Sequence, residues 1–186
     1  MDLMPFDEIN KMKDGLSIYF DGEGHIRSQA DCDDIIDEML DLFLLAYANG
    51  QAAANEDLSS DVSAPLPEVM DTVDREIAGK TWRQRVQGYF ENGGTQADIE
   101  RIIDTETHRD ANEGAYNTAR KAGAKKKVWH CMMLPTSRDT HIFLDGVSAP
   151  IDGEFYSFNG GSTLYPGQWG IAEEDVNCLC WLTYTR

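Results

Sequence analysis

Residues 129–147 read WHCMMLPTSRDTHIFLDGV, followed by PIDGEF at 150–155, YPG at 165–167 and EDVNCLCW at 174–181. Apolar runs of strand length alternate in this stretch with Pro, Gly and Asp, which favour turns. A segment so rich in turns buries little apolar surface per residue. We therefore expect a local fastener that holds the two ends of the stretch together.

This stretch predicts a small antiparallel β module. Strands are expected at about 127–133, 141–146, 154–158 and 179–185, because apolar and aromatic residues concentrate there between the turn signals. Residues that can bind a metal or one another occur at the two ends of the stretch. They are Arg138, Asp139 and His141 first, then Asp175, Cys178 and Cys180.

The chain before this module shows helical periodicity of apolar residues. It predicts helices at about 31–49, from Pro65 to about Ala78, at 82–91 and at 96–122, with a short strand or hairpin at 16–27. Thr81 and Gln84 fit a capping box, and Thr95 fits the cap of the longest helix. The fold class is therefore α+β, with a helical N-terminal part containing one long helix, followed by the small C-terminal antiparallel β module.

The charge of the chain is unevenly distributed. The net charge of the 186 residues is −17. Residues 1–80 hold 19 acidic and 5 basic side chains, a net of −14, and residues 81–186 hold 14 and 11, a net of −3. We divide the chain accordingly into an acidic, mainly helical region 1–80 and a region 81–186 with the long helix and the β module. Direct nucleic-acid binding is not expected, because it needs clustered Lys and Arg; an acidic face could instead dock on a basic partner.

The sequence predicts a protein that stays in the compartment where it is made. No run approaches the roughly 18 apolar residues of a membrane span. The start, MDLMPFDE, lacks the basic flank and apolar stretch of a signal peptide. We expect a cytoplasmic protein with no membrane contact and with its four cysteines reduced.

Polar residues interrupt the apolar stripe of the long helix at 105–109. Glu106 and Arg109 are spaced for an i,i+3 ion pair, or for hydrogen bonds to the terminal module. A catalytic role for Glu106, His108 and Arg109 is the alternative. The structural interpretation is preferred.

Several motifs of the second half occur in a recognisable order. They are IIDTETHRDANEGAYNTARKAG at 102–123, KVWH at 127–130, RDTHIFLDG at 138–146 and NCLC at 177–180. Over about 80–186 these residues resemble the phage minor head protein (head morphogenesis, MuF-like) family. The resemblance implies a virion component that associates with portal or capsid proteins during assembly in the host cytoplasm. It implies no general enzymatic activity.

The resemblance also suggests what the fastener is. Many family members carry Thr-Cys-x-x-Cys in the turn and His-Pro-Asn-Cys near the end, a pattern that looks like a zinc site. Here Arg138 and His141 occupy the turn positions, and Asp175 and Cys178 the terminal ones. Arginine stays protonated and cannot bind zinc. We therefore predict a fastener without a cofactor, made of an Arg138–Asp175 ion pair with His141 and Cys178 nearby.

A zinc site of His141, Asp175, Cys178 and Cys180 is the alternative fastener. We expect Cys178 and Cys180 to lie on one strand with their side chains on opposite faces, which argues against this site.

Three classes of function follow from the sequence. A structural head-morphogenesis protein is preferred, and no catalytic residue is assigned. A nuclease or nucleotide-modifying toxin is the second class, with His108, Arg138 and His141 as candidate catalytic groups, although the chain has no Walker loop, Gly-x-Ser-x-Gly elbow or His-Glu-x-x-His motif. A binding module for a host protein is the third. The oligomeric state stays open.

Overall fold

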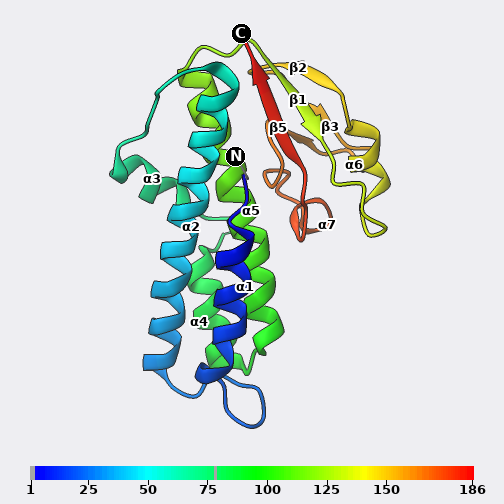
Figure 1. Cartoon of the computed structure of the whole chain (residues 1–186). Coiled ribbons are helices and arrows are strands. Elements are labelled where there is room, and N and C mark those ends of the chain that lie inside the picture. Colours follow the sequence, from blue (N-terminus) through cyan, green and yellow to red (C-terminus); the bar gives the residue numbers. More distant parts are fainter. Residues whose placement is uncertain (1–2, 78) are drawn as a thin grey trace.

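Two long helices, α2 (Gln29–Leu58) and α5 (Gln96–Lys121), run side by side through the helical part of the computed structural model (Figure 1). The structure describes residues 3–77 and 79–186. Shorter helices flank the pair: α1 (Phe6–Gly15) with the 3-10 helix η1 (Leu16–Tyr19), α3 (Leu66–Val73) and α4 (Trp82–Asn92).

The C-terminal residues form the β module at one end of the helical part (Figure 1). Strand β1 (Lys126–His130) lies between β2 (Ser148–Pro150) and β5 (Trp181–Thr185), and both neighbours are antiparallel to it. Strands β3 (Phe155–Tyr156) and β4 (Ser162–Thr163) pair separately. Two short helices, α6 (Asp139–Leu144) and α7 (Ala172–Asp175), complete the module. The predicted α+β class is confirmed.

The predicted helices are confirmed, with shifted ends. Thr81 and Gln84 form the predicted capping box of α4. Helix α2 begins earlier than predicted, because Ser28 caps it by accepting a hydrogen bond from Asp31 N, and it continues to Leu58. Helix α3 ends at Val73, and Ala78, the predicted end, lies outside the described residues.

Two local predictions are wrong. Residues 141–146 were predicted as a strand, but 139–144 form α6, whose His141 and Leu144 lie three positions apart and are both buried on one face. The hairpin at 16–27 is reduced to η1 and a single bridge between Phe20 and Ile26. Helix α1 and strand β2 were not predicted at all.

Two hydrophobic clusters make up the interior, and α5 contributes to both. The first fills the helical part and includes Ile99 and Ile103. The second lies beneath the sheet and includes Ala115 and Ala119. It also contains Trp129, Leu144, Phe155 and Leu182. Trp181 is half-buried and stacks on His130.

Two glycines set the distance between α2 and α5. A Cβ atom on Gly50 would lie 1.9 Å from the carbonyl oxygen of Ala111, and one on Gly114 would lie 2.3 Å from that of Tyr47. Real Cβ atoms do not approach a carbonyl oxygen so closely. The backbones therefore meet at a separation that only glycine allows at these two positions.

We expect Gly50→Ala to lower the free energy of unfolding by about 1–3 kcal/mol, since the added methyl group must push α5 away and loosen packing around it. Gly88→Ala on α4 is the matched control, because its Cβ would meet nothing within 4 Å. It should be neutral or stabilising by up to about 1 kcal/mol through helix propensity. Urea unfolding followed by circular dichroism measures both. Equal stability of Gly50→Ala and the wild type would contradict the close contact.

Lys127 is a fully buried lysine on β1. Its Nζ donates a hydrogen bond to Leu164 O at 2.8 Å and lies 4.8 Å from the ring centre of Tyr116. Burial lowers the pKa of Lys127 to about 8. Because the ordinary pKa of lysine is about 10.4, the unfolded chain binds more protons between these two values.

Lys127 should therefore make the free energy of unfolding rise with pH between about 8 and 10. Lys127→Met should remove this rise, whereas Lys126→Met, at the neighbouring exposed position of β1, should keep it. Urea midpoints of the three proteins across this pH range test the prediction. A rise of the same size in Lys127→Met and wild type would show that Lys127 is not its source.

Candidate metal centre

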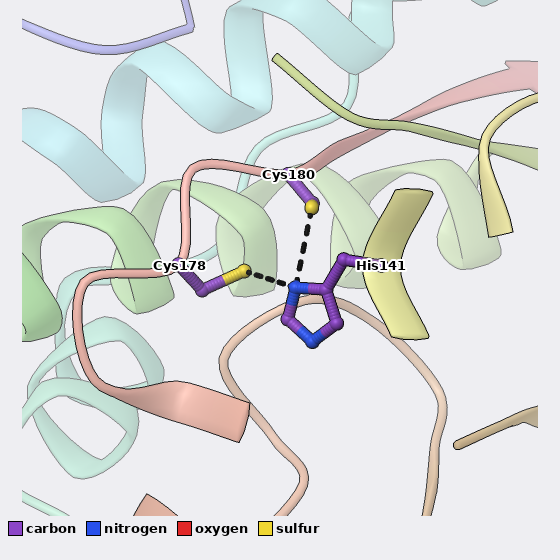
Figure 2. A group of neighbouring side chains, drawn as sticks. All are labelled: His141, Cys178 and Cys180. Carbon is purple, nitrogen blue, oxygen red and sulfur yellow. Dashed lines mark hydrogen bonds between the residues drawn. The ribbon is translucent and has the colours of Figure 1, made fainter. Parts of the chain in front are cut away.

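His141, Cys178 and Cys180 bring three metal-binding side chains together in the interior of the β module (Figure 2). The Nδ1 atom of His141 lies 3.5 Å from the Sγ of Cys178 and 3.5 Å from the Sγ of Cys180. The three ligand atoms all lie within 4.8 Å of one another, and each of the three residues is 2% exposed. Soft thiolates with imidazole form the ligand set that proteins use for zinc.

The backbone explains why both sulfur atoms point to the same place. Successive side chains of an extended segment alternate between two faces, so residues two apart share a face. Cys178 and Cys180 are both buried, while Leu179 between them is half-buried. Asn177 has a positive φ of 56°, which turns the chain sharply after α7. The expectation that Cys178 and Cys180 face opposite ways is therefore wrong, because residues two apart on an extended chain face the same way.

Glu174 holds the other side of the His141 ring. Its Oε2 atom lies 3.0 Å from His141 Nε2, and the carboxylate is fully buried. Thr140 donates a hydrogen bond to it at 3.0 Å, Asn159 donates one at 2.7 Å, and Ser157 donates a third. Although burial opposes ionisation, these hydrogen bonds lower the pKa of Glu174. A buried carboxylate thus faces Nε2, which leaves Nδ1 directed at the sulfur atoms.

The hydrogen bond between the two thiols changes their pKa values in opposite directions. The hydrogen bond to Cys180 lowers the pKa of Cys178, against the effect of burial and with help from His108 and His141. The same hydrogen bond, together with burial, raises the pKa of Cys180. Cys178 is therefore the thiol of the pair that ionises first.

His108, on α5, contacts the main chain of Cys180. Its Nε2 atom lies 2.5 Å from the carbonyl oxygen of Cys180, which also accepts a hydrogen bond from Asn112 at 3.1 Å. His108 is 2% exposed, and its buried Nδ1 atom has no hydrogen-bond partner among the described residues. The sequence analysis considered His108 only as a candidate catalytic residue in the alternative, enzymatic interpretation.

The predicted Arg138–Asp175 ion pair is replaced by bonds to the main chain. Arg138 donates to Val176 O. Asp175 accepts from Trp169 N at 2.9 Å and Gly170 N at 2.8 Å. The carboxylate of Asp175 is therefore held by these two N–H groups. Arg138 still links the turn at 138 to the chain at 176, but through a carbonyl oxygen.

Glu174 is the site residue that the sequence did not single out. The only signal was its position next to Asp175 in the EDVNCLCW motif. A run of three acidic residues, 173–175, usually lies on a solvated surface. Only the fold shows that the second of the three is buried against His141.

The polar segment of α5 forms a buried ion cluster. Arg109 lies 2.5 Å from Glu106 and 3.0 Å from Asp110, and all three are at most 1% exposed. Glu106 also pairs with Arg85, and Glu113 pairs with Arg75 at 2.7 Å. Glu106 and Arg109 thus form the i,i+3 pair that their spacing suggested.

Comparisons with known proteins give two partial relatives. No family model and no solved structure matches the chain. Over 83 residues, the chain is 35% identical to the minor head protein GP7 of Bacillus phage SPP1, covering 43% of this chain and 27% of that protein. Over 124 residues, it is 31% identical to the NAD(+)–arginine ADP-ribosyltransferase EFV of Enterococcus faecalis (strain ATCC 700802 / V583), covering 56% of this chain and 25% of that protein.

The chain spans about a quarter of the length of either curated relative. The resemblance to a phage minor head protein, expected from the motifs, is therefore present over less than half of the chain. Among the described residues, every helix is too short or too polar to span a bilayer.

We expect Arg109→Met to lower the free energy of unfolding by about 3–5 kcal/mol, because it leaves the buried carboxylate of Asp110 without its cation and leaves Glu106 with Arg85 alone. Arg101→Met is the control on the same helix. Its pair with Asp98 is half-exposed, so the loss should be about 0–1 kcal/mol. Chemical denaturation compares the two. Similar losses in both variants would mean that the cluster contributes no more than a surface pair.

Proposed function

We propose that the chain is a component of a phage head that acts by binding portal or capsid proteins during assembly. The observation that carries this proposal is the 35% identity to a phage minor head protein. The order of the motifs in the second half of the chain supports the same reading. The charge of the chain, −17, suits a partner with a positively charged surface.

Burial of the candidate catalytic groups supports a structural role. Glu106, His108, Arg109 and His141 are all at most 2% exposed. A catalytic group must reach a substrate, and these side chains instead contact one another and the main chain. Their arrangement suits a module whose interior provides stability and whose surface makes the contacts.

Two features of the surface suit a protein partner. The aromatic side chains of Phe143, Tyr156 and Phe158 are each about 70% exposed. The rings of Phe143 and Phe158 pack edge to face, with their centres 5.1 Å apart. Exposed apolar groups that gather in this way often mark interaction sites. Helix α2 also exposes an acidic face with Asp33, Asp37 and Asp41 at helical spacing.

The first test is the composition of phage particles. Mass spectrometry of virions purified from host cells should detect the chain together with portal and capsid proteins. Its absence from particles and from assembly intermediates would refute the proposal. Recovery with a host protein in place of the phage proteins would favour the alternative of a host-binding module.

The second test asks whether the acidic region makes the contact. Binding to the purified portal or major capsid protein should weaken on the order of tenfold between low salt and 0.5 M salt, because salt screens exposed charges. A triple variant with Asn at Asp33, Asp37 and Asp41 should bind more weakly already at low salt. The control removes three exposed charges from the β module, at Asp152, Glu154 and Glu173. Equal losses in the two variants would assign the effect to total charge rather than to this face.

ADP-ribosyl transfer is the second candidate function. The similarity to the Enterococcus faecalis enzyme favours it, although the match covers 25% of that protein. Release of nicotinamide from NAD⁺, in the presence of an arginine-rich acceptor protein, tests it directly. A head-assembly role predicts no release above the uncatalysed rate, and measurable turnover would support the enzyme.

A further inference from the structure

The nitrogen–sulfur distances from His141 to Cys178 and Cys180 match those between the ligand atoms of a bound metal ion. In a tetrahedral zinc site with Zn–S of about 2.3 Å and Zn–N of about 2.0–2.1 Å, nitrogen and sulfur ligands lie roughly 3.6 Å apart. The two observed distances from His141 Nδ1 to sulfur are both 3.5 Å. One ion placed among the three atoms could therefore contact all of them with little movement of the side chains.

Glu174 orients the His141 ring in the way that a carboxylate hydrogen-bonded to a metal-binding histidine orients that histidine. Metal-binding histidines usually direct their second ring nitrogen to a carboxylate or a carbonyl oxygen, which fixes the ring and its tautomer. His141 faces the carboxylate of Glu174 through Nε2, at 3.0 Å. Its Nδ1 atom is thereby left with a lone pair directed at the two thiols (Figure 2).

His108 has the same arrangement on the opposite side. A carbonyl oxygen can only accept a hydrogen bond, so the contact with Cys180 O places the proton of His108 on Nε2. The Nδ1 atom then carries a lone pair, and it is buried without a hydrogen-bond partner among the described residues. Such an orphaned buried group calls for an explanation, of which an ion is one.

His108 also lies beside the thiols. Its Nε2 atom lies 2.5 Å from the carbonyl oxygen of Cys180. The two imidazoles therefore flank the pair of cysteines, one from α5 and one from α6. Each imidazole uses Nε2 for a protein oxygen and keeps Nδ1 available.

We propose that His108, His141, Cys178 and Cys180 bind one Zn²⁺ ion, with α5 supplying the fourth ligand. Two thiolates and two neutral imidazoles make a closed tetrahedral set, which is typical of structural zinc. Binding releases the thiol protons to solvent, since both sulfur atoms must coordinate as thiolates. The ion would connect the long helix with both ends of the β module. This inference does not depend on the proposed function.

Two other side chains are poorer candidates for the fourth position. The carboxylate of Asp175 is engaged by the main-chain N–H groups of Trp169 and Gly170. Cys131 lines a small cavity together with His141 and Cys180. Like His108, it lies outside the group whose ligand atoms meet within 4.8 Å, but only His108 has a buried ring nitrogen without a hydrogen-bond partner among the described residues. On the α5 side, His108 borders a cavity of about 470 Å³.

The first experiment measures metal in the purified full-length protein. Elemental analysis should find about one zinc per chain, and X-ray absorption at the zinc edge should show two sulfur and two nitrogen ligands. Protein that contains no zinc, and that does not take up Zn²⁺ or Co²⁺ after chelator treatment, would overturn the proposal. A shell of three sulfur atoms would replace His108 with Cys131.

The second experiment assigns the ligands by titrating Co²⁺ and Zn²⁺ into metal-free variants. His108→Ala should weaken binding by at least about 100-fold, and Glu174→Gln by about 10–100-fold, as expected for an outer partner. Cys131→Ser and Cys32→Ser are controls that should bind as the wild type does. Cys32 is buried in the first cluster, away from the site.

Circular dichroism of each metal-free variant separates a lost ligand from a lost fold. A folded His108→Ala protein with unchanged affinity would overturn the assignment of His108. If His108→Ala does not fold, His108→Gln is measured, and an X-ray absorption spectrum with the wild-type two-nitrogen shell would equally overturn it. Weaker binding by Cys131→Ser alone would assign the fourth position to that thiol.

Discussion

The buried guanidinium of Arg109 is the constraint on which the junction between the helices and the β module depends. It lies on α5 between Ile103, in the first hydrophobic cluster, and Ala115, in the second. Three carboxylates surround this part of the helix, and Arg75, Arg85 and Arg109 supply three cations to them. The charges balance, which is the condition for burying them at all. The polar segment of α5 thus lies close to the boundary between the two clusters, which falls between Ala111 and Ala115.

The β module covers this ion cluster and so is fixed to α5. A Cβ atom on Gly167 would lie 3.1 Å from the Cα of Arg109, so the turn at 165–167 packs directly on the helix backbone. Arg75 binds both Glu113 and the hydroxyl of Tyr165, at 2.7 Å and 3.0 Å. The cluster is therefore sealed by a loop of the module, and separation of the module would expose several charges and break their hydrogen bonds together.

Periodic and capped segments could be predicted from the sequence, because their signals are local. The capping box of Thr81 and the apolar stripe from Ile99 determine where α4 and α5 begin. Residues 139–144 could not be assigned in this way: HIFL suits a strand or a short helix, and only burial of both His141 and Leu144 selects the helix. The contact of α2 with α5 was equally hidden, since a glycine inside a helix usually reads as a stop signal, whereas Gly50 continues α2 and allows close packing.

In the candidate metal centre, too, the sequence did not predict which side chains contact one another. Arg138 and Asp175 were predicted to pair because opposite charges at paired positions suggest an ion pair. Each instead bonds to main-chain atoms. The residue before Asp175, Glu174, occupies the buried position beside His141. A shift of one residue redirects a side chain, and composition does not record it. The polar groups near the end of the chain were therefore identifiable as a set, while their pairing required the backbone.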